Sequence, residues 1–155
     1  MTCWNRWLMI AVAALGLGVT AVGAQQQDVS TARQALMRSN GKALYSDMGK
    51  MVKGEVPYNQ ATVDAALTMI DDNLKKMPPL WAANVNKAPA PGGNFKSADK
   101  AFEDQAGFKA KIDAVAKTVS EQKAAIKNLD SLKAGATAIN NSCGGCHETY
   151  RQRNS

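Results

Sequence analysis

Apolar residues recur along this chain at every third or fourth position, the spacing that gathers them on one face of a helix. Four stretches carry the pattern, over about residues 29–53, 60–77, 98–126 and 131–151. No stretch alternates apolar and polar residues as a half-buried strand does. The pattern therefore predicts an all-α protein in which each helix buries one stripe against the others.

Capping residues set the expected ends of these helices. Asp28 and Asp130 are suitable N-caps for the first and fourth helices. Gly54 is an expected stop for the first helix. The pair Pro78-Pro79 is expected to end the second, because proline lacks the N–H that continues a helix.

The connection between the second and third helices, residues 78–96, is long and rich in proline, glycine and alanine. Trp81 and Phe95 are its expected anchors. The other connections are short or moderate, and short connections join antiparallel neighbours. The sequence therefore predicts an antiparallel up-down-up-down four-helix bundle.

The N-terminal residues have the composition of a secretory signal peptide. Arg6 is the only charged residue among residues 1–24, residues 8–22 are almost wholly apolar, and Ala24 closes a group of small residues suited to cleavage. The apolar run is shorter than the roughly 20 residues that span a bilayer. We expect cleavage after Ala24, no membrane anchor afterwards, and one periplasmic domain over residues 25–155.

Five residues near the C-terminal end carry the chemistry of the chain. The run Cys143-Gly144-Gly145-Cys146-His147 is a CxxCH haem-attachment sequence. On a helix, positions i, i+3 and i+4 share one face, so one porphyrin can receive both thioether bonds while the histidine binds its iron. The sequence therefore predicts one covalently bound haem c with His147 as an axial iron ligand.

Two other uses of this cysteine pair fit the sequence less well. A thioredoxin-like disulfide is expected in a βαβ unit, and no such pattern is visible. A structural zinc site needs four ligands, whereas residues 25–155 hold only two cysteines and one histidine. Covalent haem accounts for the histidine as well as for both thiols.

A second axial ligand would have to lie upstream of His147, because the residues after it include neither methionine nor histidine. In an antiparallel bundle the start of the first helix is level with the end of the fourth, which places Met37 beside the haem. Met77 is the reserve candidate, and flexible core filling is the alternative role for the methionines. A bound thioether gives a low-spin electron carrier, and an open position gives a site for a small gas. The methionines of residues 25–155 are Met37, Met48, Met51, Met69 and Met77.

The charge pattern gives no sign of nucleic-acid binding. Loss of Arg6 with the signal peptide would leave 18 of the 19 basic side chains beside 13 acidic ones, a formal charge of +5. The basic residues are scattered among acids, and the longest basic run is Lys75-Lys76. Scattered lysines of this kind are typical of a solvated surface.

The signal peptide, the four helices and the C-terminal CxxCH together resemble the class II cytochromes c. That family comprises the five-coordinate cytochromes c′ and their low-spin, methionine-ligated relatives. Residues 143–151 are similar to the family's C-x-x-C-H-x-x-[FY]-[RK] ending, and residues 33–37 (Arg-Gln-Ala-Leu-Met) are similar to its first-helix motif. In that motif the residue four positions after the arginine faces the open side of the haem, and here it is Met37. Residues 36–41 and 53–58 look most like the low-spin group.

The resemblance implies roles for further residues. Arg33 and Gln34 would lie beside a haem propionate, to which a cation donates charge-assisted hydrogen bonds. Arg151 would shield the proximal face of His147, and the alternative is a solvated arginine favoured by the helix dipole. Family members are often homodimers through their first two helices, so the resemblance implies a homodimer.

These observations favour a periplasmic one-electron carrier whose haem iron is ligated by His147 and Met37, with a redox protein as its partner. The alternative is a five-coordinate, high-spin cytochrome c′ that binds nitric oxide or carbon monoxide. An enzyme such as a peroxidase is disfavoured, because residues 25–155 hold no second histidine to act as a distal acid–base group.

Overall fold

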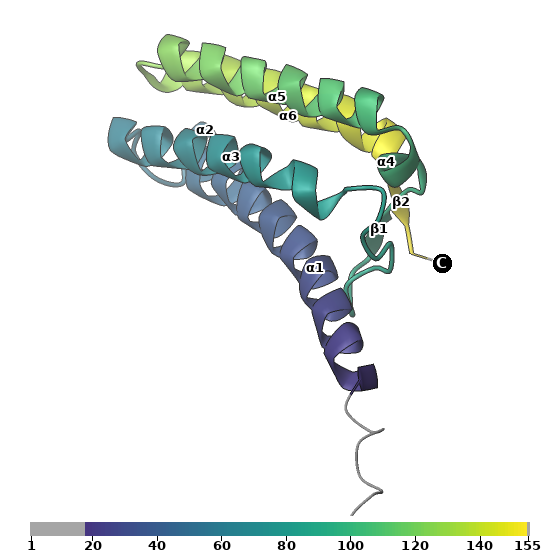
Figure 1. Ribbon diagram of the computed structural model, residues 1–155. Helices are drawn as coiled ribbons and strands as arrows, with labels where there is room; N and C mark the ends of the chain where they lie inside the picture. Colours follow the sequence, from purple (N-terminus) through teal and green to yellow (C-terminus); the bar gives the residue numbers. More distant parts are fainter. Residues whose placement is uncertain (1–17, 155) are drawn as a thin grey trace, which may run out of the picture.

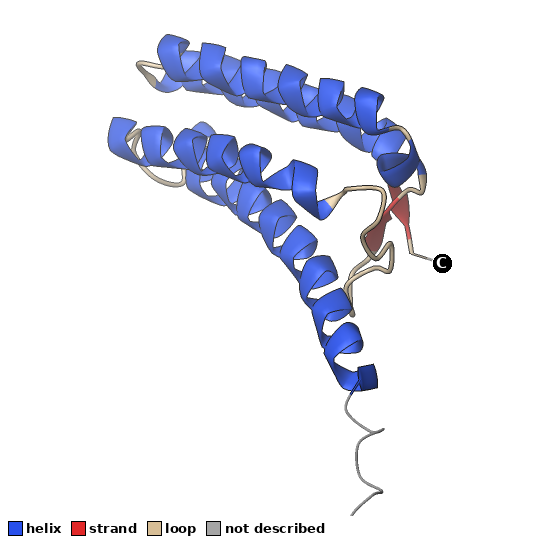
Figure 2. Ribbon diagram, viewed as in Figure 1, coloured by secondary structure: helices blue, strands red, loops and turns tan. Residues whose placement is uncertain are grey.

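The computed structural model describes residues 18–154, which form long helices and one small β-ribbon (Figures 1 and 2). The first helical unit has three consecutive segments: α1 (Gly18–Gly41), the π-helical η1 (Lys42–Met48) and α2 (Gly49–Val52). The later helices are α3 (Gln60–Leu80), α4 (Lys100–Glu103), α5 (Gln105–Ala125) and α6 (Leu129–Tyr150). The ribbon pairs β1 (Phe95–Ser97) antiparallel with β2 (Arg151–Arg153).

The helices form the antiparallel four-helix bundle that the sequence predicts. Helix α5 lies along α6, and α3 lies along both α1 and α5. Helix α6 packs on η1 and α2, and Figure 1 shows α1 running away from α6 toward its N-terminal end. The two helices at the ends of the chain are therefore close at one end of the bundle and spread at the other.

The core is made of the apolar stripes predicted for the second, third and fourth helices. The apolar residues that recur at helical spacing in the second stretch are all buried on α3: Val63, Ala66, Leu67, Ile70 and Leu74. Those of the third stretch are likewise buried on α4 and α5: Phe102, Phe108, Ile112, Val115 and Val119. In the first helical unit, Leu44, Met48 and Met51 are buried, whereas Leu36 and Met37 are half-buried against the core.

Two predicted helix starts are wrong. Helix α1 is continuous from Gly18, so Asp28 does not begin a helix, and residues 18–27 contain no proline to interrupt one. Helix α6 begins after Asn128, whose side chain accepts a hydrogen bond from the Ser131 N–H at 2.9 Å, while the Ser131 hydroxyl accepts one from the Asn128 N–H at 3.1 Å. Asp130 lies instead in the first turn, where its negative charge suits the helix dipole.

Gly54 and the pair Pro78-Pro79 were both expected to end a helix, and only Gly54 does so. Gly54 stops the helix as predicted, with a φ of 75° that favours glycine. Pro78 and Pro79 do not end α3, which continues to Leu80. Both prolines fall in the final turn, where few further backbone bonds remain to be lost, and the Trp81 N–H donates to the Pro78 carbonyl at 3.2 Å.

The third predicted helix is divided at Asp104, whose backbone leaves the helical region at φ −97° and ψ 68°. The short strands β1 and β2 were not predicted. Of the two expected anchors of the connection, Trp81 is buried in the core, whereas Phe95 is 46% exposed and is held by the pairing of β1 with β2. Three-residue strands are too short to show alternation, so the sequence pattern carried no signal for them.

The predicted signal peptide, residues 1–24, lies mostly outside the described residues. No helix within residues 18–154 is long and apolar enough to cross a membrane.

Candidate functional site

The CxxCH residues occupy the last two turns of α6. Cys143 and Cys146 are free thiols, half-buried against the core. Burial raises the pKa of both thiols, and for Cys146 the charge of Lys111 opposes that rise. Burial lowers the pKa of the half-buried His147, and the positive charge of Arg151 adds to this effect. The imidazole is therefore favoured in its neutral form, which is the form that binds a metal.

This set of donors fits a covalently attached haem. The two thiols are not joined to each other, and together with His147 they follow the i, i+3, i+4 spacing on one helix. Half-buried apolar side chains, suited to an apolar ring, pack against the core from both terminal helices: Leu36, Met37, Cys143 and Cys146. Two thioether bonds and one imidazole nitrogen would hold the ring at α6.

A hydrogen bond between the first and last helices sets the level of Met37. The Tyr45 hydroxyl donates to the Asn140 side-chain oxygen at 2.6 Å. From this contact, His147 lies seven residues further along α6 and Met37 eight residues back along the antiparallel first helix, distances of about 10.5 and 12 Å along the two axes. Met37 and His147 are therefore at nearly the same level of the bundle.

Met77 reaches a similar level from α3. The Asn73 amide donates to the Asn40 side-chain oxygen at 2.8 Å, which aligns α3 with α1. Met77 lies four residues beyond Asn73, about 6 Å, and Met37 three residues before Asn40, about 4.5 Å. The two methionines differ in exposure, because Met77 is buried and Met37 is half-buried.

Arg33 is buried one turn before Met37 and holds the connection after α3. Its Nε donates to the Leu80 carbonyl at 2.7 Å, and an Nη donates to the Asn86 carbonyl. The guanidinium also lies 4.8 Å from the ring centre of Phe102. Burial lowers the pKa of Arg33, yet the C-terminal carbonyls of α3 supply negative dipole charge to this cation. These bonds use two of its five N–H groups.

Gln34 lies against the same connection, since a Cβ placed on Gly93 would be 3.0 Å from the Gln34 amide nitrogen. The structure thus groups Arg33 and Gln34 with residues 80–94. Cys143, Cys146 and His147 form a second group on α6. Arg151 follows this second group as the first residue of β2, with its guanidinium 4.4 Å from the ring centre of Phe95.

The buried Tyr150 and the half-buried Asp104 form a corner that the sequence analysis missed. The Tyr150 hydroxyl donates to Asp104 at 2.9 Å, and Asp104 also accepts from the Gly107 N–H at 2.9 Å as the N-cap of α5. A Cβ on Gly107 would lie 2.6 Å from the Tyr150 oxygen, so only glycine fits. Phe108 meets the Tyr150 ring edge-on at 5.1 Å. The sequence did hold a signal for this corner. Asp104 lies inside the third apolar stretch, three residues before Gly107, which is the spacing of an N-cap.

This corner predicts an alkaline effect on stability. Burial, then the bond to Asp104, raises the pKa of Tyr150 to about 12 from an ordinary value of 10. The resulting stabilisation is complete below pH 10 and is lost as the pH rises toward 12, because the unfolded chain loses its proton first. Tyr150→Phe is expected to lower the free energy of unfolding by about 1–2 kcal/mol at neutral pH. Thermal unfolding followed by circular dichroism should show wild type approaching the variant between pH 10 and 12. A constant difference across that range would contradict this role.

Covalent attachment predicts that both thiols are needed. After denaturation and acid–organic extraction, haem should remain with the wild-type polypeptide. Cys143→Ser and Cys146→Ser should each reduce the yield of haem-containing protein severalfold, measured by haem staining of a denaturing gel against total protein. Cys3→Ser is the matched control and should leave the yield unchanged, because Cys3 belongs to the predicted signal peptide. Free haem extracted from wild type would contradict the prediction.

Known proteins are similar to this chain over most of its length. A family model described as cytochrome c′ matches residues 28–151. The chain is 38% identical to cytochrome c-555 of Bradyrhizobium diazoefficiens, over 92% of this chain and 95% of that protein. It is also 38% identical to cytochrome c-556 of Rhodopseudomonas palustris, over 94% and 96% of the two chains.

Solved structures give the same result for the fold. An NMR-validated structural model of oxidised cytochrome c556 from R. palustris superposes with a TM-score of 0.70 at 35% identity, covering 84% of this chain and all of that one. A variant of cytochrome c′ from the same organism gives 0.69 at 32% identity, covering 81% and 98%.

Proposed function

Because this chain belongs to the cytochrome c′ family of class II cytochromes c, we propose that it is a periplasmic one-electron carrier with a low-spin haem ligated by His147 and Met37. As a member of that family it carries one covalently bound haem c. The haem supplies reversible one-electron iron chemistry when bound. The chain's own residues determine how that iron is ligated, buried and reached.

Each site residue has a proposed role. Cys143 and Cys146 form the thioether bonds, and His147 supplies the proximal nitrogen from the same face of α6. Arg33, which supplies a cation one turn before Met37, and Gln34 bind a haem propionate. Arg151 covers the proximal side of His147. None of these roles requires a group that transfers protons to a substrate, so we propose that the protein is not an enzyme.

The observation that carries the proposal is the alignment of the two terminal helices by Tyr45 and Asn140. It supports Met37 as the second axial ligand, because a ligand on the first helix must be level with His147 on the last. Met37 is also half-buried, so its sulfur is not enclosed in the core. A thioether ligand stabilises ferrous iron and raises the reduction potential, which suits an electron carrier.

A five-coordinate cytochrome c′ that binds nitric oxide or carbon monoxide is the second candidate. Its support is the relative named cytochrome c′ from R. palustris, which is 33% identical over 84% of this chain. The similar proteins thus include both cytochromes c-556 and a cytochrome c′. Whether Met37 binds the iron decides between the two candidate functions.

The proposal includes export and assembly. Cleavage after Ala24 would shorten α1 at its N-terminal end and leave residues 25–155 as one domain. Members of this family are often homodimers, and we expect the same of this chain. Analytical ultracentrifugation of the secreted haem protein measures both its mass and its association.

Spectroscopy of the wild-type haem protein tests the proposed ligation. Absorption and electron paramagnetic resonance spectra should be low-spin in the ferric state, and the ferrous absorption spectrum should also be low-spin. Carbon monoxide should bind poorly, because it must displace a sulfur ligand. A high-spin wild type that binds carbon monoxide readily would overturn the proposal in favour of cytochrome c′.

A further inference from the structure

The β-ribbon presents an exposed aromatic ring between two arginines. Arg153 lies directly opposite Phe95 in the register of the two strands. The guanidinium of Arg151 is 4.4 Å from the Phe95 ring centre, and that of Arg153 is 5.9 Å from it. Phe95 remains 46% exposed, although the ring is large and apolar. We call Phe95, Arg151 and Arg153 the ribbon patch.

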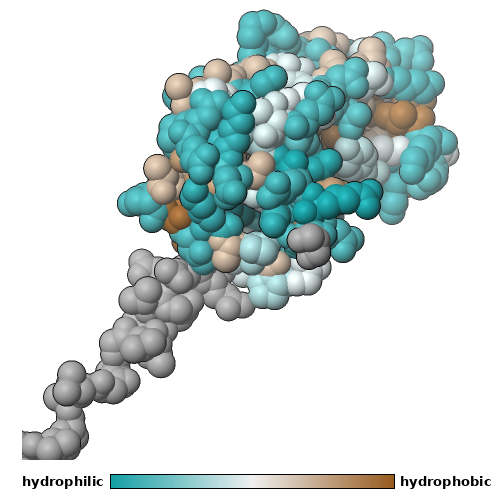
Figure 3. All heavy atoms as spheres, turned by 90° about the vertical axis from the view of Figure 1, so that its right-hand side faces the viewer, coloured by the Kyte–Doolittle hydropathy of each residue, from teal (hydrophilic) through white to brown (hydrophobic). Residues whose placement is uncertain are grey.

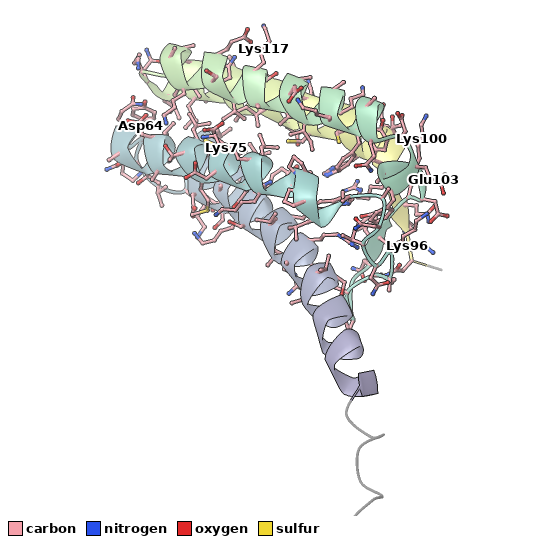
Figure 4. The ribbon with its side chains drawn as sticks, viewed as in Figure 1. Asp64, Lys75, Lys96, Lys100, Glu103 and Lys117 are labelled. Carbon is pink, nitrogen blue, oxygen red and sulfur yellow. The ribbon has the colours of Figure 1, made fainter. Side chains whose placement is uncertain are left out.

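The ribbon patch has excess positive charge. Neither arginine forms an ion pair with a carboxylate within residues 18–154. Lys96, Lys100 and the carboxylate of Glu103 lie at the same end of the bundle in Figure 4, and Figure 3 shows this end to be mostly hydrophilic. Glu148 is the one carboxylate among the residues that line the adjoining pocket. A partner here would meet more positive than negative charge.

The ribbon patch adjoins the proximal iron ligand. All three of its residues line an open pocket of about 400 Å³ together with His147 and Gly144 of the CxxCH sequence. A molecule resting on the patch would therefore lie next to the residue that binds the iron. Few protein atoms would separate the two, which is the requirement for electron exchange.

The composition of the patch favours a protein as its occupant. Arginine and aromatic residues are enriched at the energetic centres of protein interfaces, and a ring flanked by two cations offers both apolar contact and charge. Complementary charge also speeds the encounter of two proteins.

We propose that the ribbon patch is the docking surface for a one-electron redox protein whose own surface carries clustered carboxylates. The inference rests on the proposed electron-carrier function. In the encounter one electron would pass from the reduced partner to the ferric haem, so that the partner is oxidised and the haem iron is reduced. No bond or proton has to be exchanged.

Binding of poly-L-glutamate to the haem protein tests the charge of the patch without any redox step. Arg153→Glu reverses one charge on the ribbon patch. Lys127→Glu makes the same change at the turn between α5 and α6, the other end of the 22-residue α6. At low salt, calorimetry should show affinity for poly-L-glutamate falling by at least about fivefold in Arg153→Glu and less than about twofold in Lys127→Glu. The difference should vanish at high salt.

Electron exchange tests the location of the patch. The ferrous protein can be oxidised by the anion hexacyanoferrate(III) or by the cation tris(phenanthroline)cobalt(III), each of which accepts one electron. Arg153→Glu should slow the reaction with the anion and speed that with the cation, each by about three- to tenfold at low ionic strength. Lys127→Glu should change both rates by less than about twofold. Circular dichroism and the haem absorption spectrum confirm that each variant is folded.

Three outcomes would overturn the proposal. Equal effects of the two variants would show that net charge alone matters. Unchanged rates in Arg153→Glu would place electron exchange elsewhere on the surface. The wild-type protein could also sediment with vesicles of anionic phospholipid. If Arg153→Glu abolished that sedimentation but retained poly-L-glutamate binding, the occupant of the patch would be a membrane. None of these outcomes depends on the spin state, so failure here is distinct from failure of ligation by Met37.

Discussion

Replacing Met37 by alanine is expected to convert the protein from a low-spin form to a high-spin form that binds carbon monoxide. The change would remove the proposed sulfur ligand and leave His147 in place. The reduction potential should fall by on the order of 0.1 V, within the roughly 0.8 V over which axial ligands tune haem. Absorption spectra of both oxidation states, carbon monoxide titration and a redox titration measure these effects.

Met69→Ala is the matched control for this experiment. Met69 belongs to α3, but 40% of its surface is exposed, and its substitution should leave spectrum and potential unchanged. The helical circular dichroism of Met37→Ala should remain close to wild type, because Met37 is only half-buried. A low-spin Met37→Ala variant would make Met77, at a similar level on α3, the ligand to test next. A wild-type spectrum that is high-spin and unaffected by the substitution would instead assign the protein to the cytochromes c′.

Loss of haem is expected to unfold much of the bundle. Leu36, Met37, Cys143 and Cys146 are only half-buried by the chain itself, so the ends of α1 and α6 depend on further apolar contacts. A group bound to the folded state alone stabilises that state. The double variant Cys143→Ala/Cys146→Ala, expressed without haem, should lose on the order of half its helical circular dichroism, since isolated helices are marginal in water.

The same double variant can be tested for what remains folded. Helices α3 and α5 pack on each other, and each carries fully buried residues such as Leu67 and Val119. Hydrogen exchange should therefore be slowest there and fastest in α1 and the last turns of α6. Wild-type helicity with a single cooperative thermal transition in the haem-free protein would contradict this prediction.

The helices and their buried faces could be predicted because they depend on repetition. Residues spaced like Val63, Leu67, Ile70 and Leu74 can all be buried together only if the segment is helical and turns this face inward. Periodicity alone therefore identified the helix and its buried face. The errors in helix boundaries lie where a single side-chain hydrogen bond determines the boundary. Asn128 and Asp130 are both good N-caps, and the return bond from Ser131 selects Asn128. Asp104 interrupts a periodic stretch because Tyr150, far away in the sequence, also binds it.

Prediction of the site followed the same division. Cys143, Cys146 and His147 could be recognised because their chemistry requires a fixed spacing on one helix. Phe95 was expected to anchor the connection, but the pairing of β1 with β2, for which the sequence pattern carried no signal, holds it at the surface. The two backbone bonds of Arg33 could not be foreseen either, since they depend on where the irregular connection passes.

The π-helical segment η1 determines which way Met37 faces. Each residue of an α-helix turns the chain by about 100°, and a π-helical turn holds more residues than an α-helical one. Segment η1 lies between Met37 and the buried Met51 of α2, and its own last residue, Met48, is buried, so it sets the rotational phase of α1 relative to this anchored end. Removing one residue from η1 would keep the helix intact but rotate Met37 by about 100° around the axis. The proposed ligation by Met37 would therefore be lost on a single-residue deletion within residues 42–48, although none of those residues is expected to contact the iron.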